Sequence, residues 1–263
     1  MGSATRGALA RAVATLNAQA KVDLAVGEQL FAASLVLAGS PQLAAALADD
    51  TAEDENRKGI VDAVFAKYGT AARSVIETLS TERWSSEEDL IAGMEELGIR
   101  AVAESAPKSL SIEDELFAFV NAVTSDSELE LALGSKLGTV EGKISIIHAL
   151  LDGKASAQTI AILTALVAQP RGRRIGELIR YATSIVADQS NLIVANLTVA
   201  RPIEAKQLGR LVAALTEQYG RAMRVQQVVD PSIVGGIRVQ IGDDVIDGSI
   251  ANRIADLRLR LVS

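Results

Sequence analysis

Two stretches of this chain, 86 residues apart, share one pattern of apolar positions and helix breaks. The first, residues 40–67, reads SPQLAAALADDTAEDENRKGIVDAVFAK, and the second, residues 126–153, reads DSELELALGSKLGTVEGKISIIHALLDG. The apolar residues that coincide are Leu43 and Leu129, Ala46 and Ala132, Leu47 and Leu133, Ile60 and Ile146, Val61 and Ile147, Ala63 and Ala149, Val64 and Leu150, and Phe65 and Leu151. Self-similarity at a fixed spacing is typical of a duplicated structural unit. The pattern therefore predicts two copies of one helical packing, which meet near residues 106–109.

The sequence from Thr5 to about Ala187 has apolar residues at helical spacing. Leu9, Val13 and Leu16 follow one another at steps of four and three residues, which places them on one helical face. Clusters such as GSPQ, DDTAEDE and YGTA divide the stretch into helices of roughly 10 to 15 residues. These features predict compact helical bundles, and the second copy shows no counterpart of the opening helix.

The period of the apolar residues changes at Asn191. In LIVANLTVA they alternate, which predicts a strand. An amphipathic helix over residues 205–215 follows, then strands in RVQQVVD and IRVQI, and a last helix over residues 250–261 that Ser249 would begin. The predicted fold is mostly α with a small α+β C-terminal domain. Two tandem helical bundles, residues 1–106 and 107–190, precede a strand-helix-strand-strand-helix domain in residues 191–263.

Composition excludes several classes of function. The chain has no cysteine, which rules out disulfides, zinc–thiolate sites and cysteine nucleophiles. Its net charge of −7 disfavours general binding to nucleic-acid phosphates. The longest weakly polar run, AQTIAILTALVAQ, is shorter than the ~20 residues of a spanning helix, and no secretory signal pattern opens the chain. We expect a soluble intracellular protein that meets a membrane only through a partner.

Five features could have carried chemistry, and none forms a catalytic arrangement. His148 has no catalytic partner at a recognisable spacing, so we expect a packing or surface role. The acidic run at residues 49–55 lacks the spacing of a calcium loop, and GTVEGKI at residues 138–144 departs from a phosphate loop. The RGRR run at residues 171–174 is either a solvated helix start or a contact for an acidic partner. Trp84 is expected to be a local packing anchor. We predict no catalytic, cofactor or metal site.

Two adjacent glycines near the C-terminus raise the question of a ligand loop. A phosphate-binding loop needs glycines before a helix N-terminus, whereas Gly235 and Gly236 precede a predicted strand. Glycines in that place more often mark a bulge or a close approach of two backbone segments. Gly242 lies in a GDD run that predicts a hairpin turn. The structural interpretation is therefore favoured.

The run VVDPSIVGGIRVQIGDDVIDGSIANRIADL resembles the C-terminal signature of the delta subunit of bacterial rotary ATP synthases. That family is related to the mitochondrial oligomycin-sensitivity-conferring protein. The upstream helices resemble the helical domain of the family, so the resemblance covers essentially the whole chain. Two helical domains resemble the enlarged actinobacterial form, and Ala8 stands where the family commonly has an aromatic residue. The signature residues are Asp230, Gly235, Gly236, Gly242, Asp247, Gly248 and Ser249.

The resemblance implies a non-catalytic stator subunit of the peripheral stalk, at the cytoplasmic face of the plasma membrane. It implies two partners, the N-terminal helix of an alpha subunit and the stalk b subunits. The family groove for the alpha helix lies between the first and fifth helices, and the first repeat keeps the opening helix. The candidate groove residues, some of which must belong to the core, are Leu9, Val13, Leu16, Ile76 and Leu79. The second repeat is either a spacer or a further contact site.

Two alternative functions remain at this stage. A helical RNA-binding or transcription-factor module would need a basic face, which the acidic charge disfavours. A generic helical adaptor would leave the α+β tail unexplained. Both rank below the stator.

Overall fold

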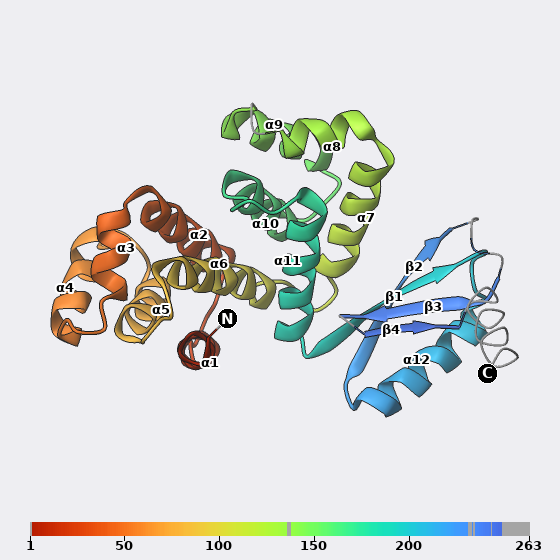
Figure 1. The fold of residues 1–263 in the computed structure, drawn as a ribbon, viewed down its shortest axis with the longest axis horizontal. Coiled ribbons are helices and arrows are strands. Elements are labelled where there is room, and N and C mark those ends of the chain that lie inside the picture. Colours follow the sequence, from red (N-terminus) through yellow and green to blue (C-terminus); the bar gives the residue numbers. More distant parts are fainter. Residues whose placement is uncertain (1, 136–137, 231–232, 234, 243, 249–263) are drawn as a thin grey trace, which may run out of the picture. The chain divides into compact units, whose positions relative to one another are not determined.

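The computed structural model describes residues 2–135, 138–230, 233, 235–242 and 244–248. The chain forms two compact units, residues 1–186 and 187–263. The first is helical and carries the tandem repeat (Figure 1). Its helices are α1 Ser3–Asn17, α2 Leu24–Gly39, α3 Pro41–Ala48, α4 Asp54–Val64, α5 Thr70–Thr81, α6 Glu87–Glu104, α7 Ile112–Ser125, α8 Ser127–Gly134, α9 Val140–Leu151 and α10 Ala157–Ala168, with most of α11 Ile175–Gln189.

The repeat is confirmed in the order, length and burial of the helices. Helices α3 and α4 begin at residues 41 and 54, and α8 and α9 begin at 127 and 140, so both pairs keep the spacing of 86. Helices α5 and α10 are equally long and bury the same places along their length. The buried residues are Ala72, Val75, Ile76, Leu79 and Ser80 in α5, and Thr159, Ile162, Leu163, Leu166 and Val167 in α10.

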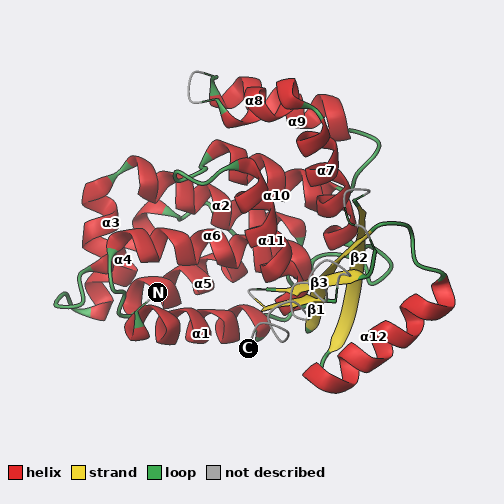
Figure 2. Ribbon diagram, turned by 45° about the vertical axis from the view of Figure 1, so that its right-hand side comes forward, coloured by secondary structure: helices red, strands yellow, loops and turns green. Residues whose placement is uncertain are grey.

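Two hydrophobic clusters meet inside the helical unit. The first joins α1 to α6, and the second joins α7 to α11 but also takes in Phe31 from α2 with Ile99 and Val102 from α6. Helices α2 and α6 lie side by side at the centre (Figure 2). Because they contribute to both clusters, the division of the helical part at residue 106 stays a prediction.

The missing first helix of the second repeat is replaced from within the chain. In the first repeat α1 packs against α5 and α6. In the second repeat α10 has no such helix of its own and packs instead against α6 and α2. The corresponding side of α10 is therefore already covered.

The α+β unit builds one sheet with the strand order β2-β1-β3-β4. Its elements are β1 Leu192–Val199, α12 Ala205–Tyr219, β2 Ala222–Val229, β3 Ile237–Ile241 and β4 Asp244–Asp247. Strand β1 pairs with β2 in parallel through the α12 crossover and with β3 antiparallel, and β3 pairs antiparallel with β4. Ala195, Leu197 and Val199 alternate inward against α12, as predicted.

The sequence predicted the order of this unit as far as β3 and missed β4. That strand is only four residues long, and its two apolar residues, Val245 and Ile246, are adjacent, so it has no alternation of apolar and polar side chains. All four residues are exposed. Residues 249–263, with the predicted final helix and the proposed cap Ser249, lie outside the described residues.

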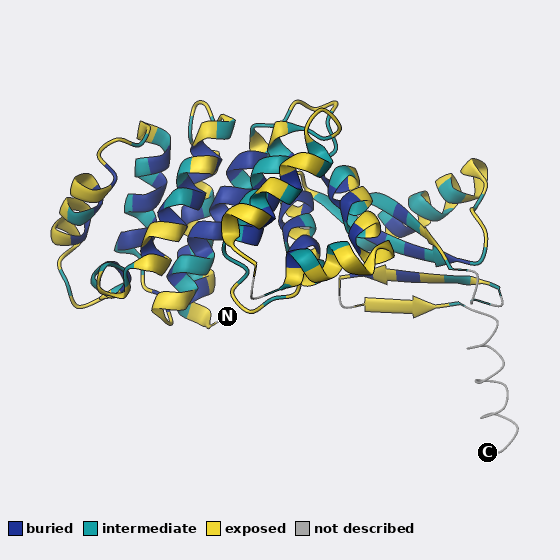
Figure 3. Cartoon of the chain, turned by 90° about the horizontal axis from the view of Figure 1, so that it is seen from above, coloured by how far each residue is buried: buried dark blue, intermediate teal, exposed yellow. Residues whose placement is uncertain are grey.

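Within the described ranges no single helix is both long and apolar enough to cross a membrane. Helices α2 and α3 reach that length and composition only together, and the chain bends by 107° between them. In the helical unit the buried residues lie between the helices and the exposed ones on their outer sides (Figure 3). The residues of α2 that belong to the two clusters are Val26, Leu30, Phe31, Ala33 and Leu37.

Candidate partner-binding surfaces

The five predicted groove residues belong to one hydrophobic cluster but not to one open surface. Leu16, Ile76 and Leu79 are fully buried core residues. Leu9 and Val13 pack against that core and stay half-exposed. Only these two can present apolar surface to a partner in this conformation, which agrees with the expectation that some of the five are core.

The two flanks of α1 differ in chemistry. On one flank Arg11 is paired with Glu82, and the Thr78 hydroxyl lies 3.2 Å from that of Thr15, so polar contacts bridge α1 to α5 and the turn after it. At 100° per residue, Leu9 and Val13 fall on the other side of the buried stripe. That second flank is the open one.

The start of α6 holds α1 in place. Thr5 is fully buried, and its hydroxyl donates to Asp89 at 2.6 Å. The backbone N–H of Ser85 also donates to the Thr5 hydroxyl, at 3.2 Å. A buried polar side chain with partners fixes orientation as well as position.

The RGRR run directly precedes α11, and Arg171 and Arg174 are exposed, as a solvated helix start predicts, whereas Arg173 makes internal contacts. Arg173 donates two hydrogen bonds to the Glu95 carboxylate of α6, at 2.7 and 2.9 Å. Arg171 donates to the Glu88 carbonyl at 2.9 Å. Arg173 therefore departs from the solvated helix start, and with the backbone contact of Arg171 it ties the second repeat to α6. The contact between Arg173 and Glu95 could not be predicted from the sequence, because the two residues are 78 positions apart.

An aromatic ring completes the junction between α6 and α11. The Arg173 guanidinium lies 4.8 Å from the centre of the Tyr181 ring, a favourable cation–π distance. Burial, then the nearby Glu96 and Glu95 carboxylates, raise the pKa of the Tyr181 phenol well above its usual value of 10.0. Glu96 is itself held by Arg100 at 2.8 Å. This cluster of charges is internal to the helical unit.

The glycine-rich signature has a structural explanation. Gly235 and Gly236 have φ values of 149° and 89°, which favour glycine, and they lead directly into β3. Gly242, at φ 56°, turns the chain between β3 and β4, so the predicted hairpin is confirmed. At Gly248 an added Cβ would lie 3.1 Å from the Ile237 carbonyl oxygen, a close backbone approach.

Two further signature residues, Asp230 and Asp247, contact strands of the sheet. The Asp230 backbone N–H donates to the Val199 carbonyl at 2.9 Å. Asp247 stands opposite Arg238 in the β3–β4 register. The signature residues that the structure describes therefore lie at the turns and strand ends of the sheet.

The remaining chemical candidates have ordinary roles. His148 is exposed and lies 3.0 Å from Asp152. Asp49 accepts hydrogen bonds from the hydroxyl and the backbone N–H of Thr51, and these bonds lower its pKa. Trp84 donates from Nε1 to the Leu79 carbonyl at 2.7 Å, so it is the packing anchor that was predicted. No group of three metal-ligating side chains occurs among the residues the structure describes.

The chain is thus a mostly helical protein with a tandem helical repeat, followed by a small α+β unit with a mixed four-stranded sheet. The family model of the ATP synthase delta (OSCP) subunit matches residues 99–261. Among the curated relatives, ATP synthase subunit delta of Leifsonia xyli subsp. xyli is 48% identical over 99% of both chains. The subunit of Acidothermus cellulolyticus is 38% identical, over 90% of this chain and 88% of its own. That of Thermobifida fusca is 34% identical, over 90% and 89%.

The chain belongs to the ATP synthase delta (OSCP) subunit family. It is a non-catalytic subunit of the peripheral stalk of the ATP synthase complex, and its association with the membrane is through that complex. The family model begins inside α6 and leaves α1 to α5 outside it. The alignment with the Leifsonia relative nevertheless includes those helices.

Proposed function

We propose that the first helical repeat holds the catalytic head by binding the N-terminal helix of an alpha subunit along the open flank of α1. The mechanism is mechanical, because rotation driven by protons yields ATP only while the head is kept from turning with the rotor. The observation that carries the proposal is the partly exposed apolar pair Leu9 and Val13, with exposed Ala10 one turn before Val13 on the same flank. An amphipathic helix in an apolar groove is a common recognition mode.

The choice of the first repeat has a physical reason. The family model covers the second repeat, where α6 and α2 stand in the place of the first helix. Every residue from 93 to 99 of α6 is buried, so that part of α6 offers no open side to a partner. Helix α1 has one face in the core and one flank tied to α5, and its other flank, with Leu9 and Val13, is partly exposed.

Calorimetric titration of the full chain with a peptide of the cognate alpha N-terminus tests this proposal. Replacing Leu9 and Val13 together by alanine removes the apolar contacts and is expected to weaken binding roughly tenfold or more. The matched control is Val64→Ala on α4, which is 44% exposed and should bind as the native chain does. Equal binding by the native chain and the double variant would sink the assignment to α1.

We further propose that the α+β unit binds the distal ends of the stalk b subunits, so that the chain sits at the cytoplasmic face of the plasma membrane as a peripheral component. Both edge strands of its sheet carry exposed apolar residues, Val228 and Val229 on β2 with Val245 and Ile246 on β4. Exposed apolar side chains at a sheet edge are unusual without a partner, since bare edges favour aggregation.

Removing residues 187–263 tests whether the helical unit binds the alpha subunit and the α+β unit binds the b subunits. The shortened chain keeps the compact helical unit and is expected to bind the alpha peptide with unchanged affinity. It should lose all binding to a peptide of the b C-terminus in the same titration. Retained b binding would contradict the role given to the α+β unit, whereas lost alpha binding would contradict the role of the first repeat.

A further inference from the structure

Helix α6 belongs to the core of both repeats. In the first repeat it packs against α1, α2, α3 and α5, and in the second it packs against α10, where that repeat has no first helix of its own. Every residue from 93 to 99 is buried, which is about two turns of helix, so α6 is covered on all sides there. Its contributions to the first cluster are Leu90, Met94, Leu97 and Ala101, and those to the second are Ile99 and Val102. Helix α6 therefore cannot leave one repeat without opening the other.

The connection between α10 and α11 holds α6 and α2 by hydrogen bonds. Arg173 donates two of them to the Glu95 carboxylate of α6. The Ser34 hydroxyl of α2 lies 3.2 Å from the side-chain oxygen of Gln169, and Ser34 is buried. Such contacts favour one arrangement of the helices, because Glu95 and Ser34 would each lose a hydrogen bond inside the protein if the connection moved away. The second repeat thus keeps α2 and α6 in one relative position.

The first turn of α6 links the second repeat to α1. The Thr5 hydroxyl of α1 donates to the Asp89 carboxylate at 2.6 Å. The neighbouring Glu88 carbonyl accepts a hydrogen bond of 2.9 Å from Arg171, which belongs to the connection between α10 and α11. One turn of α6 is therefore bonded to α1 and to the second repeat through adjacent residues. The position of α1 depends on a helix that the second repeat helps to hold.

The duplication explains why one helix serves both repeats. A second bundle with a first helix of its own would close its core without α6, and the two repeats could then unfold separately. Here α6 and α2 cover α10, and the two hydrophobic clusters share these helices. Residues 1–186 accordingly form one compact unit. A compact unit whose cores share two helices is expected to unfold in a single cooperative transition.

We propose that the second repeat stabilises α6, and through α6 the open flank of α1, so that the helical unit unfolds as one cooperative body. This gives the duplicated repeat an internal role, which differs from that of a spacer or of a further contact site. The part that concerns the open flank rests on the proposed binding of the alpha helix at α1. There the second repeat keeps the flank in one orientation while the stalk resists rotation of the head. The cooperative unfolding itself is tested without any partner.

Hydrogen exchange of the backbone amides of the full chain tests the cooperativity. Ile76 in α5 and Ile162 in α10 are both fully buried, and the two helices correspond to each other in the repeat. Ile162→Val removes one buried methylene and is expected to accelerate exchange of the slowest amides about fivefold. The acceleration should be the same in α5 as in α10, because the slowest amides exchange through unfolding of the whole unit. Ile76→Val should have the same effect on both helices from within the first repeat.

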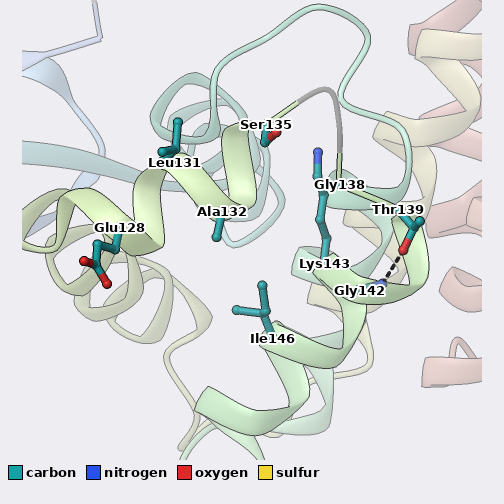
Figure 4. A pocket seen from close by; sticks show the side chains of 9 residues that line it. All are labelled: Glu128, Leu131, Ala132, Ser135, Gly138, Thr139, Gly142, Lys143 and Ile146. Atoms are coloured by element: carbon teal, nitrogen blue, oxygen red, sulfur yellow. Dashed lines mark hydrogen bonds between the residues drawn. The ribbon is translucent and has the colours of Figure 1, made fainter.

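Leu131→Ala is the control within the second repeat. Leu131 lies along α8 beside the open space between α8 and α9, and it is 72% exposed (Figure 4). Helix α8 packs against α7, and α9 packs against α10. Truncating an exposed side chain there should leave the slow amides of both repeats within about twofold of their native rates. Melting temperatures show that each variant is folded. An effect of Ile162→Val that is confined to residues 107–186 would overturn the proposal.

Adding a peptide of the cognate alpha N-terminus to the same measurement tests the link to α1. At about a hundred times its Kd, the peptide should slow exchange through complete unfolding about hundredfold, because it binds only the folded unit. We expect this slowing in α10 as well as in α5. The double variant Leu9→Ala, Val13→Ala binds the peptide at least about tenfold more weakly, so the same peptide concentration should slow its exchange at most about tenfold.

The two helices distinguish failure of this proposal from failure of binding at α1. Slowing in α5 without slowing in α10 would overturn the cooperative unit and leave the binding at α1 intact. No slowing in either helix would contradict binding at α1, and with it the orienting role of the second repeat. In that case the result for Ile162→Val still decides whether the two repeats unfold together.

Discussion

Replacing Gly27 by alanine is expected to lower the free energy of unfolding of the helical unit by about 3 kcal/mol, the upper end of what overpacking costs. A Cβ at Gly27 would lie 2.4 Å from a methyl carbon of Val102 and 3.0 Å from the Gly98 carbonyl oxygen. The side chain of Val102 can turn, but the backbone of α6 cannot yield without moving the helix. Since α2 and α6 contribute to both hydrophobic clusters, a shift there disturbs both repeats.

Urea denaturation followed by circular dichroism measures this effect, and Gly59→Ala is the matched control. Gly59 lies inside α4 and has no atom within 4 Å of an added Cβ. Alanine there should raise stability by up to about 1 kcal/mol, because it favours the helix over the unfolded chain. The same substitution thus has opposite signs at the two sites. A stabilising effect at Gly27 would show that the two helices do not approach as closely as described.

Local pattern sufficed for most of the fold. The repeat spacing of 86, the strand alternation after Asn191 and the Gly242 turn all follow from periodicity or from glycine within a short window, and each is found in the structure. Strand β4 was missed because four exposed residues carry no pattern. The sequence therefore predicts the order of the elements wherever an element buries one of its faces.

The candidate sites were harder to predict, because each depends on which residues meet across the fold. Periodicity placed Leu9 and Leu16 on one stripe of α1, but only the packed structure separates the half-exposed Leu9 from the buried Leu16. The Arg173–Glu95 contact joins positions 78 residues apart, and no local signal marks it.

Breaking the Arg173–Glu95 ion pair is expected to have a second large effect on stability. The effect should differ between the two partners, because they are buried to different extents. Glu95 is 4% exposed at its side chain and Arg173 is 24% exposed. Arg173→Met leaves a carboxylate buried without its partner, and we expect a loss of about 3 kcal/mol in unfolding free energy. Glu95→Gln should cost less, about 1 to 2 kcal/mol, because Arg173 can still reach water and keeps its contact with the Tyr181 ring.

A double-mutant cycle separates the energy of the ion pair from the cost of burying its two charges. Combining Arg173→Met with Glu95→Leu removes both charges from the junction, and the double variant should be within about 1 kcal/mol of the native chain. The exposed pair of Arg83 and Asp50, 75% and 43% exposed, is the matched control, and Arg83→Met should change stability by less than about 0.5 kcal/mol. If Arg173→Met is as mild as Arg83→Met, the junction does not hold the two repeats together. If it has the larger effect, the RGRR run is a structural clasp, and the orientation of the second repeat against α6 is fixed by charge as well as by apolar packing.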